Sequence, residues 1–368
     1  MKVLVTGANG FIGKNLVMRL REQAGIEVLT YVRGQDDSAL RDSLRQCDAV
    51  VHLAGENRPA NLQAFAEVNT VLTERLCNCL KALGKTIPLI LASSAQAELD
   101  NPYGHSKLAA EQVVKALAND YGNPVAIYRL PGVFGKWCKP NYNSVVATFC
   151  HNKAYDLPVQ INDANARVRL VYVDDVATAM LGQLATGWTG VARPTIEPEY
   201  TITLGELSAQ IDAFKNSRST LMSERVGTGL TRALYATYVS YLQFEKFAYN
   251  VPAHVDTRGV FVEMLKTPDA GQFSFFTAYP GITRGGHYHH TKTEKFLVIK
   301  GHARFGFRHM LTDELHYLET KGDLPQIVET VPGWTHDITN IGTEEMVVML
   351  WANEIFDPAN PDTIASKV

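Results

Sequence analysis

The spacing of hydrophobic positions changes once along the chain, near residue 250. Before that point, segments of helical spacing alternate with short apolar runs at 2–6, 26–32, 48–55 and 88–94. This alternation predicts a doubly wound parallel sheet with helices as crossovers. After it, period-two runs separated by Gly and Pro predict an antiparallel sandwich or barrel. A chain of 368 residues is about twice the usual domain size, so we predict an α/β domain over 1–245 and an all-β domain over 251–368.

The first apolar run leads into three glycines, Gly7, Gly10 and Gly13, and then into a helical pattern. A strand, glycine turn and helix in this order lets backbone N–H groups approach a pyrophosphate at the positive end of the helix. The second run ends at Arg33, where an acidic residue would hold a ribose 2′-hydroxyl; an arginine can pair with a 2′-phosphate instead. We therefore favour NADP(H) over NAD(H), and the alternative is that Arg33 is a solvated charge.

A second motif, YGHSK at 103–107, predicts proton transfer chemistry. Tyr103 and Lys107 are four residues apart, so on a helix they share a face. The positive charge is expected to lower the pKa of the phenol, which could then exchange a proton with a carbonyl oxygen. Ser94, or else Ser93, ends the run at 88–94 and could donate a hydrogen bond to the same oxygen.

With these motifs, residues 1 to about 240 resemble the extended short-chain dehydrogenases/reductases that act on nucleotide sugars. The matching segments are TGANGFIG, DAVVHLAG, ASSA, YGHSK, RLPGVFG and VYVDD. The resemblance implies that Tyr103 is the acid/base, Lys107 its partner and a ribose ligand, and Ser94 the carbonyl donor. Together with the glycine turn it predicts these cofactor contacts: Gly7, Gly10, Phe11, Ile12, Gly13, Arg33, Leu53, Ala54, Gly55, Tyr103 and Lys107.

The resemblance is less regular on the substrate side. Asn141 and Asn143 are similar in placement to residues that hold the nucleotide of the sugar. The arginine usual before the YVDD motif is replaced by Val168, and either neighbour, Arg167 or Arg169, could reach a diphosphate. The segment between Ser94 and Tyr103 is short for this family, which indicates a trimmed active-site loop. The stretch 230–247, rich in Tyr and Leu at helical spacing, fits either core packing or a contact between domains or subunits.

The all-β segment carries a predicted metal site, formed by His287, His289, Glu294 and His336. Imidazoles and a carboxylate suit a borderline divalent cation; Zn²⁺ is the first choice, and Ni, Fe and Mn stay open. The run HYHH lets His290 replace His289 as a ligand. Four side chains are expected at the pocket mouth: Arg284, Tyr288, Lys292 and Trp334. The spacings G-x5-H-x-H-x4-E-x6-G and G-x2-H-x3-N resemble the two signatures of the cupin family, whose fold is a jelly-roll barrel.

A reductase of this kind fused to a cupin resembles the bifunctional capsular-polysaccharide enzymes on the route to UDP-N-acetyl-L-fucosamine. The resemblance implies C3 epimerisation of a UDP-2-acetamido-2,6-dideoxy-4-hexulose in the cupin and NADPH-dependent reduction of its C4 ketone in the first domain. The C3 base is left open between His289, His290 and Lys292. Two alternatives remain: a single-activity reductase with a non-catalytic cupin that binds or dimerises, or a redox-neutral epimerase with tightly held NAD.

Composition adds bounds on partners and location. The net charge of -3 gives no footprint for nucleic acid, and the chain has neither a signal-peptide pattern nor an apolar run long enough to span a membrane. Five cysteines, an odd number, fit free thiols in a reducing compartment. These bounds indicate a cytoplasmic protein. The resemblance implies a UDP-linked keto-deoxy sugar as substrate, and we expect a homodimer.

Overall fold

The computed structural model describes residues 1–58, 65–290, 292–359 and 361–368. It divides the chain into two compact units, one of residues 1–211 and 233–243 and the other of residues 212–232 and 244–368. Each unit has its own hydrophobic core, and each is described separately below.

The first unit is built on a parallel sheet with the strand order β2-β1-β3-β4-β5-β8. Its strands are β1 (Lys2–Thr6), β2 (Glu27–Tyr31), β3 (Ala49–His52), β4 (Leu89–Ser94), β5 (Val125–Leu130) and β8 (Val191–Ala192). The chain runs from β1 outward to β2 and then returns to the other side of β1 as β3. This reversal leaves a crevice at the carboxyl ends of β1 and β3, where open α/β sheets bind ligands.

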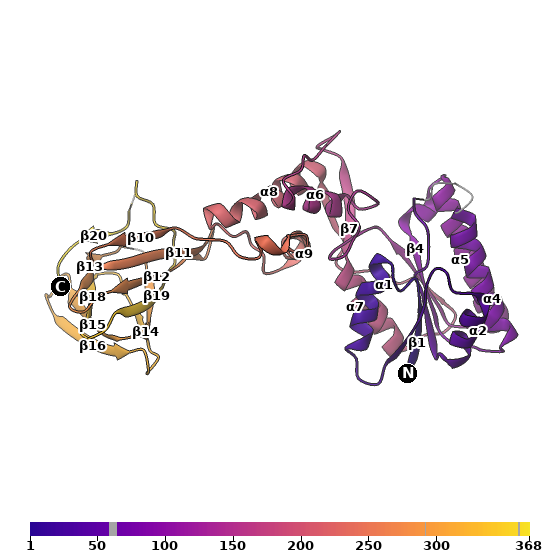
Figure 1. Cartoon of the computed structure of the whole chain (residues 1–368), viewed down its shortest axis with the longest axis horizontal. Coiled ribbons are helices and arrows are strands. Elements are labelled where there is room, and N and C mark those ends of the chain that lie inside the picture. Colours follow the sequence, from indigo (N-terminus) through magenta and orange to yellow (C-terminus); the bar gives the residue numbers. More distant parts are fainter. Residues whose placement is uncertain (59–64, 291, 360) are drawn as a thin grey trace. The chain divides into compact units, whose positions relative to one another are not determined.

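Helices cover both faces of this sheet (Figure 1). On one face α1 (Phe11–Arg21) and α7 (Val173–Thr186) pack on Val3 and Val5. On the other face α2 (Asp37–Gln46), α4 (Leu72–Ala82) and α5 (Pro102–Tyr121) pack on Leu4. Successive residues of β1 thus point to opposite faces, and a run with no polar interruption follows from burial on both sides. Two short helical segments also belong to this unit: η1 (Ala66–Val71) and η2 (Ala95–Glu98).

The rest of the first unit begins with a small sheet of order β6-β7-β9. Its strands are β6 (Gly132–Phe134), β7 (Arg167–Tyr172) and β9 (Tyr200–Thr203), and α6 (Val145–Ala154) belongs to the same unit. The helices α8 (Leu204–Thr220) and α9 (Gly229–Val239) are divided between the two units, and η3 (Phe244–Lys246) lies in the second. In α9, Ala233, Leu234 and Tyr238 are buried, and the Tyr241 hydroxyl donates to the carbonyl of Cys138. Of the two hypotheses for 230–247, core packing therefore accounts for Ala233, Leu234, Tyr238 and Tyr241.

The second unit contains two antiparallel sheets. The first has the order β10-β11-β12-β19-β14-β17 and the second the order β16-β15-β18-β13-β20. Their strands are β10 (Ala253–Asp256), β11 (Gly259–Thr267), β12 (Gly271–Ala278), β13 (Thr283–Tyr288), β14 (Glu294–Lys300), β15 (His302–His309), β16 (Leu315–Lys321), β17 (Ile327–Glu329), β18 (Trp334–Asn340), β19 (Met346–Ala352) and β20 (Ile364–Ala365). Phe276, Phe296, Phe305 and Ile338 form a core shared by both sheets. The predicted fold class, a Rossmann sheet followed by a cupin-type jelly-roll barrel, is confirmed.

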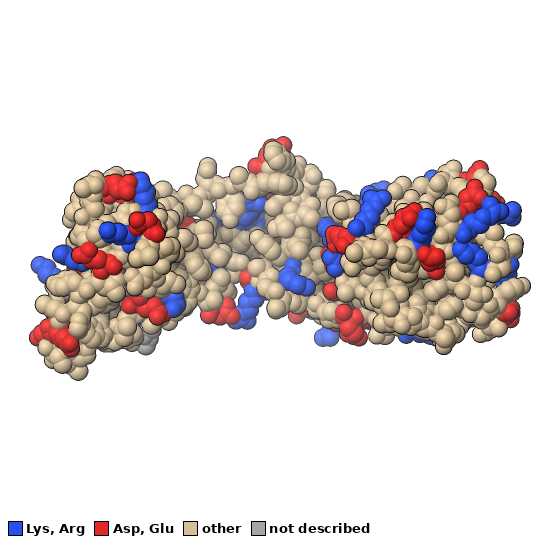
Figure 2. All heavy atoms as spheres, turned by 90° about the horizontal axis from the view of Figure 1, so that it is seen from below, with Lys and Arg blue, Asp and Glu red and all other residues tan. Residues whose placement is uncertain are grey.

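On the face shown in Figure 2, basic and acidic side chains are interspersed and do not gather by sign. This fits the near balance of 35 Lys and Arg against 38 Asp and Glu. Within the part of the chain that the structure describes, no helix is both long and apolar enough to cross a membrane.

Candidate functional site

A cleft of about 740 Å³ lies where the strand order of the parallel sheet reverses. Gly7 has a φ of +69°, and a Cβ there would lie 2.7 Å from the backbone nitrogen of Ala54. A Cβ on Gly13 would lie 2.3 Å from the carbonyl oxygen of Gly7. Only glycine fits both positions, so the turn after β1 packs closely and brings the amino end of α1 to the wall of the cleft.

Most of the residues predicted to contact a dinucleotide line this cleft. They are Gly7, Gly10, Phe11, Ile12, Gly13, Arg33, Leu53, Gly55, Tyr103 and Lys107. Ala54 does not line it; its backbone N–H donates to the hydroxyl of Thr6 at 3.2 Å. The cleft therefore joins the glycine turn to the helix that carries the YGHSK motif.

Tyr103 and Lys107 lie on α5, which begins with Asn101 as its cap and Pro102 in its first turn. Lys107 is buried, and its ammonium donates to the carbonyl of Ala92 at 2.9 Å. Burial lowers the pKa of Lys107 to about 8, and the nearby Glu111 carboxylate opposes the shift.

The expected depression of the Tyr103 pKa is wrong for this structure. Burial raises the pKa of Tyr103, and the hydrogen bond with Ser94 only partly offsets this rise. The Lys107 ammonium hydrogen-bonds the Ala92 carbonyl, and it is not among the groups that shift the Tyr103 pKa. The phenol is thus a protonated donor at neutral pH, suited to deliver a proton rather than to remove one.

Of the two serines that end β4, Ser94 is the one that reaches Tyr103. Ser93 is buried and donates to Glu111 at 2.7 Å, and Glu111 also binds the guanidinium of Arg129 at 2.7 Å and 2.8 Å. This buried network ties the end of β4 to α5. Ser93 lines the cleft as Ser94 does, but its hydroxyl is engaged by Glu111, and the network fixes the backbone that presents Ser94.

On the substrate side, Asn143 and Arg169 line the cleft, whereas Asn141 does not. Arg169 forms an ion pair with Glu199, with contacts of 2.5 Å and 2.9 Å. Arg167 does not line the cleft, so of the two arginines that flank Val168 the structure brings Arg169 to it.

Sequence reasoning missed a hydrogen-bonded group at the cleft, formed by Glu56, Tyr142 and Asn69. Glu56 and Tyr142 line the cleft and hydrogen-bond to each other at 2.7 Å. Asn69 lies in η1, a π-helical turn of the kind frequent at functional sites. Its side chain binds the backbone N–H and C=O of Glu56 and the hydroxyl of Ser106, each at 2.9 Å. Only Glu56 carried a signal, since it directly follows the LAG turn.

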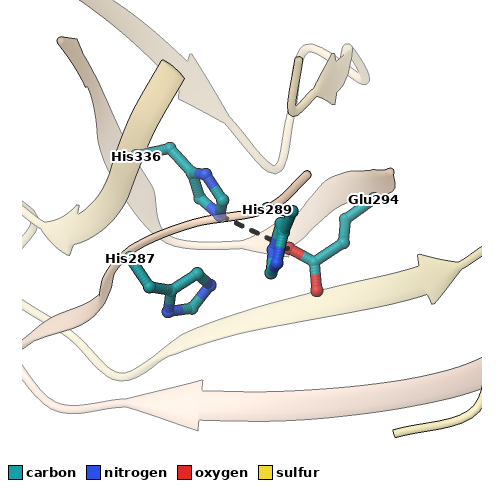
Figure 3. Close-up of side chains that lie close together, drawn as sticks. All are labelled: His287, His289, Glu294 and His336. Carbon is teal, nitrogen blue, oxygen red and sulfur yellow. Dashed lines mark hydrogen bonds and ion pairs between the residues drawn. The ribbon is translucent and has the colours of Figure 1, made fainter. Parts of the chain in front are cut away.

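In the second unit, His287, His289, Glu294 and His336 point toward one another (Figure 3). Their candidate ligand atoms all lie within 4.8 Å of one another. His287 and His336 are cross-strand partners on β13 and β18, and a register shift after Gly285 precedes them. Glu294 begins β14 in the other sheet, so the cluster joins the two sheets.

The hydrogen bonds of this cluster fit a bound cation. His289 Nδ1 lies 2.5 Å from the carbonyl oxygen of Asp362, which can only accept, so Nδ1 carries a proton. In the neutral ring Nε2 is then a lone pair, and it faces a Glu294 carboxylate oxygen at 3.2 Å. Nδ1 of the buried His336 has no hydrogen-bond partner among the described residues, and Nε2 lies 3.4 Å from a Glu294 carboxylate oxygen. Burial and the neighbouring His336 lower the pKa of His287 to about 4, so its ring is a neutral ligand at neutral pH.

The structure separates His289 from its rival. His290 is exposed, and its ring lies against Tyr288, while His289 is buried in the cluster. A cavity of about 220 Å³ opens beside the cluster and is lined by His287, Glu294 and Lys292 among others. Of the four side chains expected at the pocket mouth, Lys292 lines this cavity and Arg284, Tyr288 and Trp334 do not. Thr291 lies outside the described residues.

Comparison with known proteins agrees with this division of the chain. The NAD dependent epimerase/dehydratase family matches residues 3–193, and the polysaccharide biosynthesis C-terminal domain matches residues 254–364. The chain belongs to the NAD dependent epimerase/dehydratase family. Members of this family use a nicotinamide cofactor, which the cleft beside Tyr103 would accommodate.

Two similar proteins match this family member over its full length. It is 56% identical to UDP-2-acetamido-2,6-beta-L-arabino-hexul-4-ose reductase of Pseudomonas aeruginosa, over 100% of this chain and 99% of the relative. The crystal structure of the capsular polysaccharide assembling protein CapF of Staphylococcus aureus covers 100% of both chains, at 42% identity and a TM-score of 0.92. The resemblance to the bifunctional capsular-polysaccharide enzymes is thereby confirmed.

A more distant structure supports the fold alone. UDP-glucuronic acid 4-epimerase of Bacillus cereus, solved with NAD, covers 66% of this chain and 98% of its own, at 18% identity and a TM-score of 0.56.

Proposed function

We propose that the protein converts a UDP-2-acetamido-2,6-dideoxy-4-hexulose in two steps. The all-β unit epimerises C3, and the Rossmann unit reduces the C4 ketone with NADPH, giving a UDP-N-acetyl-6-deoxy-L-talosamine-type product for capsule or O-antigen synthesis. The observation that carries the proposal is the set Ser94, Tyr103 and Lys107 beside a dinucleotide cleft, in a chain 56% identical over its whole length to a reductase of such a sugar.

In the reduction, bound NADPH supplies the hydride that C4 accepts. Tyr103 donates its phenolic proton to the C4 oxygen as the carbon–oxygen double bond becomes a single bond, and solvent later returns a proton to Tyr103. The raised pKa of the phenol supports this direction of transfer. Ser94 hydrogen-bonds the same oxygen, and the Lys107 ammonium, which also lines the cleft, would bind the ribose of the cofactor.

The choice of NADPH over NADH rests on Arg33. Its side chain is 82% exposed and lines the cleft, so it could turn to a 2′-phosphate of the cofactor.

In the all-β unit, His287, His289, Glu294 and His336 would hold one divalent ion, with Zn²⁺ as the first choice. Such an ion would supply positive charge beside an enolate formed when the proton on C3 is removed. Among the three candidate bases, Lys292 is supported because it lines the cavity, while His289 belongs to the cluster and His290 is exposed.

The decisive test is the stoichiometry of cofactor use. We expect one NADPH oxidised for each keto sugar consumed, measured by absorbance together with product NMR. A redox-neutral epimerase would consume none.

For the first step, the full chain in D₂O without NADPH should exchange deuterium into C3. Exchange that is absent from the metal-loaded protein would favour the alternative of a single-activity reductase with a non-catalytic cupin.

We also propose a cytoplasmic homodimer, for which the outer face of the β12-β19-β14 sheet is the candidate interface. Apolar side chains pair across neighbouring strands there: Phe273, Phe275, Leu297, Ile327, Met349 and Trp351. Aromatic residues and Met are enriched at interfaces, and two-fold dimers are the commonest oligomers. We expect Met349→Asp to sediment as a monomer where the unmodified chain is a dimer. Leu311→Asp, at a turn position 91% exposed, should stay dimeric.

A further inference from the structure

The carboxylate of Glu56 gathers several donors at the edge of the dinucleotide cleft. One of its oxygens accepts from Arg33 at 3.0 Å, and the other accepts from the Tyr142 hydroxyl at 2.7 Å. The backbone N–H groups of Asn57 and Arg58 point to the second oxygen at 3.2 Å and 3.4 Å. Glu56 itself is only 15% exposed, so this carboxylate is held in place rather than free in solvent.

Such a set of donors resembles a phosphate site. A guanidinium, a hydroxyl and successive backbone N–H groups are the groups with which proteins commonly bind a phosphate. Burial acts to raise the pKa of Glu56, but the hydrogen bonds from Tyr142, Arg33 and the backbone outweigh it and hold the pKa below its usual range. The side chain is therefore an anion in the place where an anionic group of a ligand would bind.

Glu56 is also fixed from behind. The side chain of Asn69 binds both the N–H and the C=O of Glu56, so the backbone of this residue is anchored. Arg33, in contrast, has an exposed side chain. When a 2′-phosphate enters, Arg33 can move, and Glu56 stays nearby as a negative charge.

We propose that Glu56 competes with the 2′-phosphate of NADP(H) for Arg33 and thereby limits how strongly the cleft prefers NADP(H) over NAD(H). A dinucleotide with a free 2′-hydroxyl leaves the Arg33–Glu56 pair intact. A dinucleotide with a 2′-phosphate must share the Arg33 guanidinium with Glu56. Its phosphate also lies beside the Glu56 carboxylate, and this repulsion speeds release of the dinucleotide. The proposal rests on the proposed use of NADPH.

The test measures the Kd of NADPH and of NADH by fluorescence titration of the full chain. In Glu56→Gln the charge is gone but the shape is kept, and we expect NADPH to bind about fivefold more tightly, the equivalent of one exposed ion pair, with NADH unchanged within about twofold. Glu56→Asp keeps the charge but withdraws it by one methylene, so it should give a smaller gain in the same direction. Asp42→Asn is the control, because Asp42 pairs with Arg45 on α2 and does not line the cleft.

The failures are distinguishable. If Arg33→Ala weakens NADPH binding but neither Glu56 variant strengthens it, Glu56 is not a competitor and the NADPH assignment stands. If the unmodified chain binds NADH as tightly as NADPH and Arg33→Ala changes neither, the proposed cofactor is wrong, and this inference fails with it. In the double variant of Arg33→Ala and Glu56→Gln, the gain should vanish. A gain that persists would mean that Glu56 acts on the 2′-phosphate without Arg33, which also overturns the proposal.

Discussion

At the scale of single residues, the geometry around Tyr103 gives the sharpest test of the reductase. Tyr103→Phe removes the proton donor and keeps the ring, so we expect kcat to fall by about 10²- to 10⁴-fold with little change in the Kd of NADPH. Single-turnover oxidation of NADPH with the keto sugar measures the first quantity, and cofactor fluorescence measures the second. Tyr121→Phe, the same change at the exposed end of the same helix, should leave both unchanged. A near-normal rate in Tyr103→Phe would remove Tyr103 from the mechanism.

Lys107 sets the expected pH dependence of the reduction. Its pKa is lowered to about 8 by burial, so the ammonium is charged below about pH 8 and loses its proton above it. The ammonium would bind the ribose of the cofactor through charge-assisted hydrogen bonds, so kcat/KM for NADPH should fall as the pH rises through about 8. The Glu111 carboxylate raises the Lys107 pKa, and in Glu111→Gln the fall should begin at lower pH.

The measurement for this prediction is the initial rate of NADPH oxidation across the pH range. Glu98→Gln is the matched control, because Glu98 is an exposed partner of the same Arg129 and is not among the groups that shift the Lys107 pKa. If Glu111→Gln and the unmodified chain have the same pH profile, Lys107 does not cause the fall of kcat/KM at high pH.

The residue scale also shows where sequence reasoning stops. The spacing of the YGHSK motif correctly predicted that Tyr103 and Lys107 share a helix face. It gave the wrong sign for the Tyr103 pKa, because the depth of burial and the hydrogen bond from Lys107 to Ala92 are set by packing. The partners of Glu56 could not be found from the sequence either, since Arg33 and Tyr142 lie 23 and 86 residues away.

At the scale of elements, α5 depends on one close approach near its start. A Cβ on Gly104 would lie 2.3 Å and 2.6 Å from the carbonyl oxygens of Gln96 and Leu99. Gly104→Ala should therefore shift the amino end of α5 away from η2 and destabilise the protein by about 1 to 3 kcal/mol. Because Tyr103 is the preceding residue, the reductase rate should fall as well.

Denaturant unfolding and the rate of NADPH oxidation measure these two effects. The control is Gly182→Ala on α7, where a Cβ would meet nothing within 4 Å. Its helix position gives an expected change between zero and about 1 kcal/mol of stabilisation. Equal stability of the two variants would show that the contact between α5 and η2 is not tight.

Elements were more predictable than their pairing. The runs at 2–6, 26–32 and 88–94 correspond to β1, β2 and β4 within one residue at each end. β1 and β4 are buried on both faces and leave an uninterrupted apolar signal, whereas β2 is a partly exposed edge strand. His287 and His289, two positions apart in the sequence, both enter the cluster. The sheet order could not be predicted in this way, because β13 pairs with β18 through contacts 49 to 56 residues apart. Glu294 was predicted as a ligand, but its place in the opposite sheet could not be predicted for the same reason.

At the scale of the whole molecule, the two units have separate hydrophobic cores, and a metal would be bound by only one of them. A ligand that binds only the folded state stabilises the part that it binds. In calorimetry of the full chain we therefore expect two transitions. A strong chelator should lower the temperature of the transition of the all-β unit by several degrees, and NADPH should raise that of the Rossmann unit.

His336→Ala removes a metal ligand and a joint between the two sheets. It should lower the temperature of the chelator-sensitive transition by as much as the chelator does, and the chelator should then have no further effect on that transition. Metal analysis should find about one ion per chain before chelation and less in this variant.

Lys292→Met should keep its metal, because Lys292 is outside the ligand set. If Lys292 is the base, this variant should lose C3 exchange. A chelator that moves both transitions together, or neither, would contradict a metal site confined to the β-barrel.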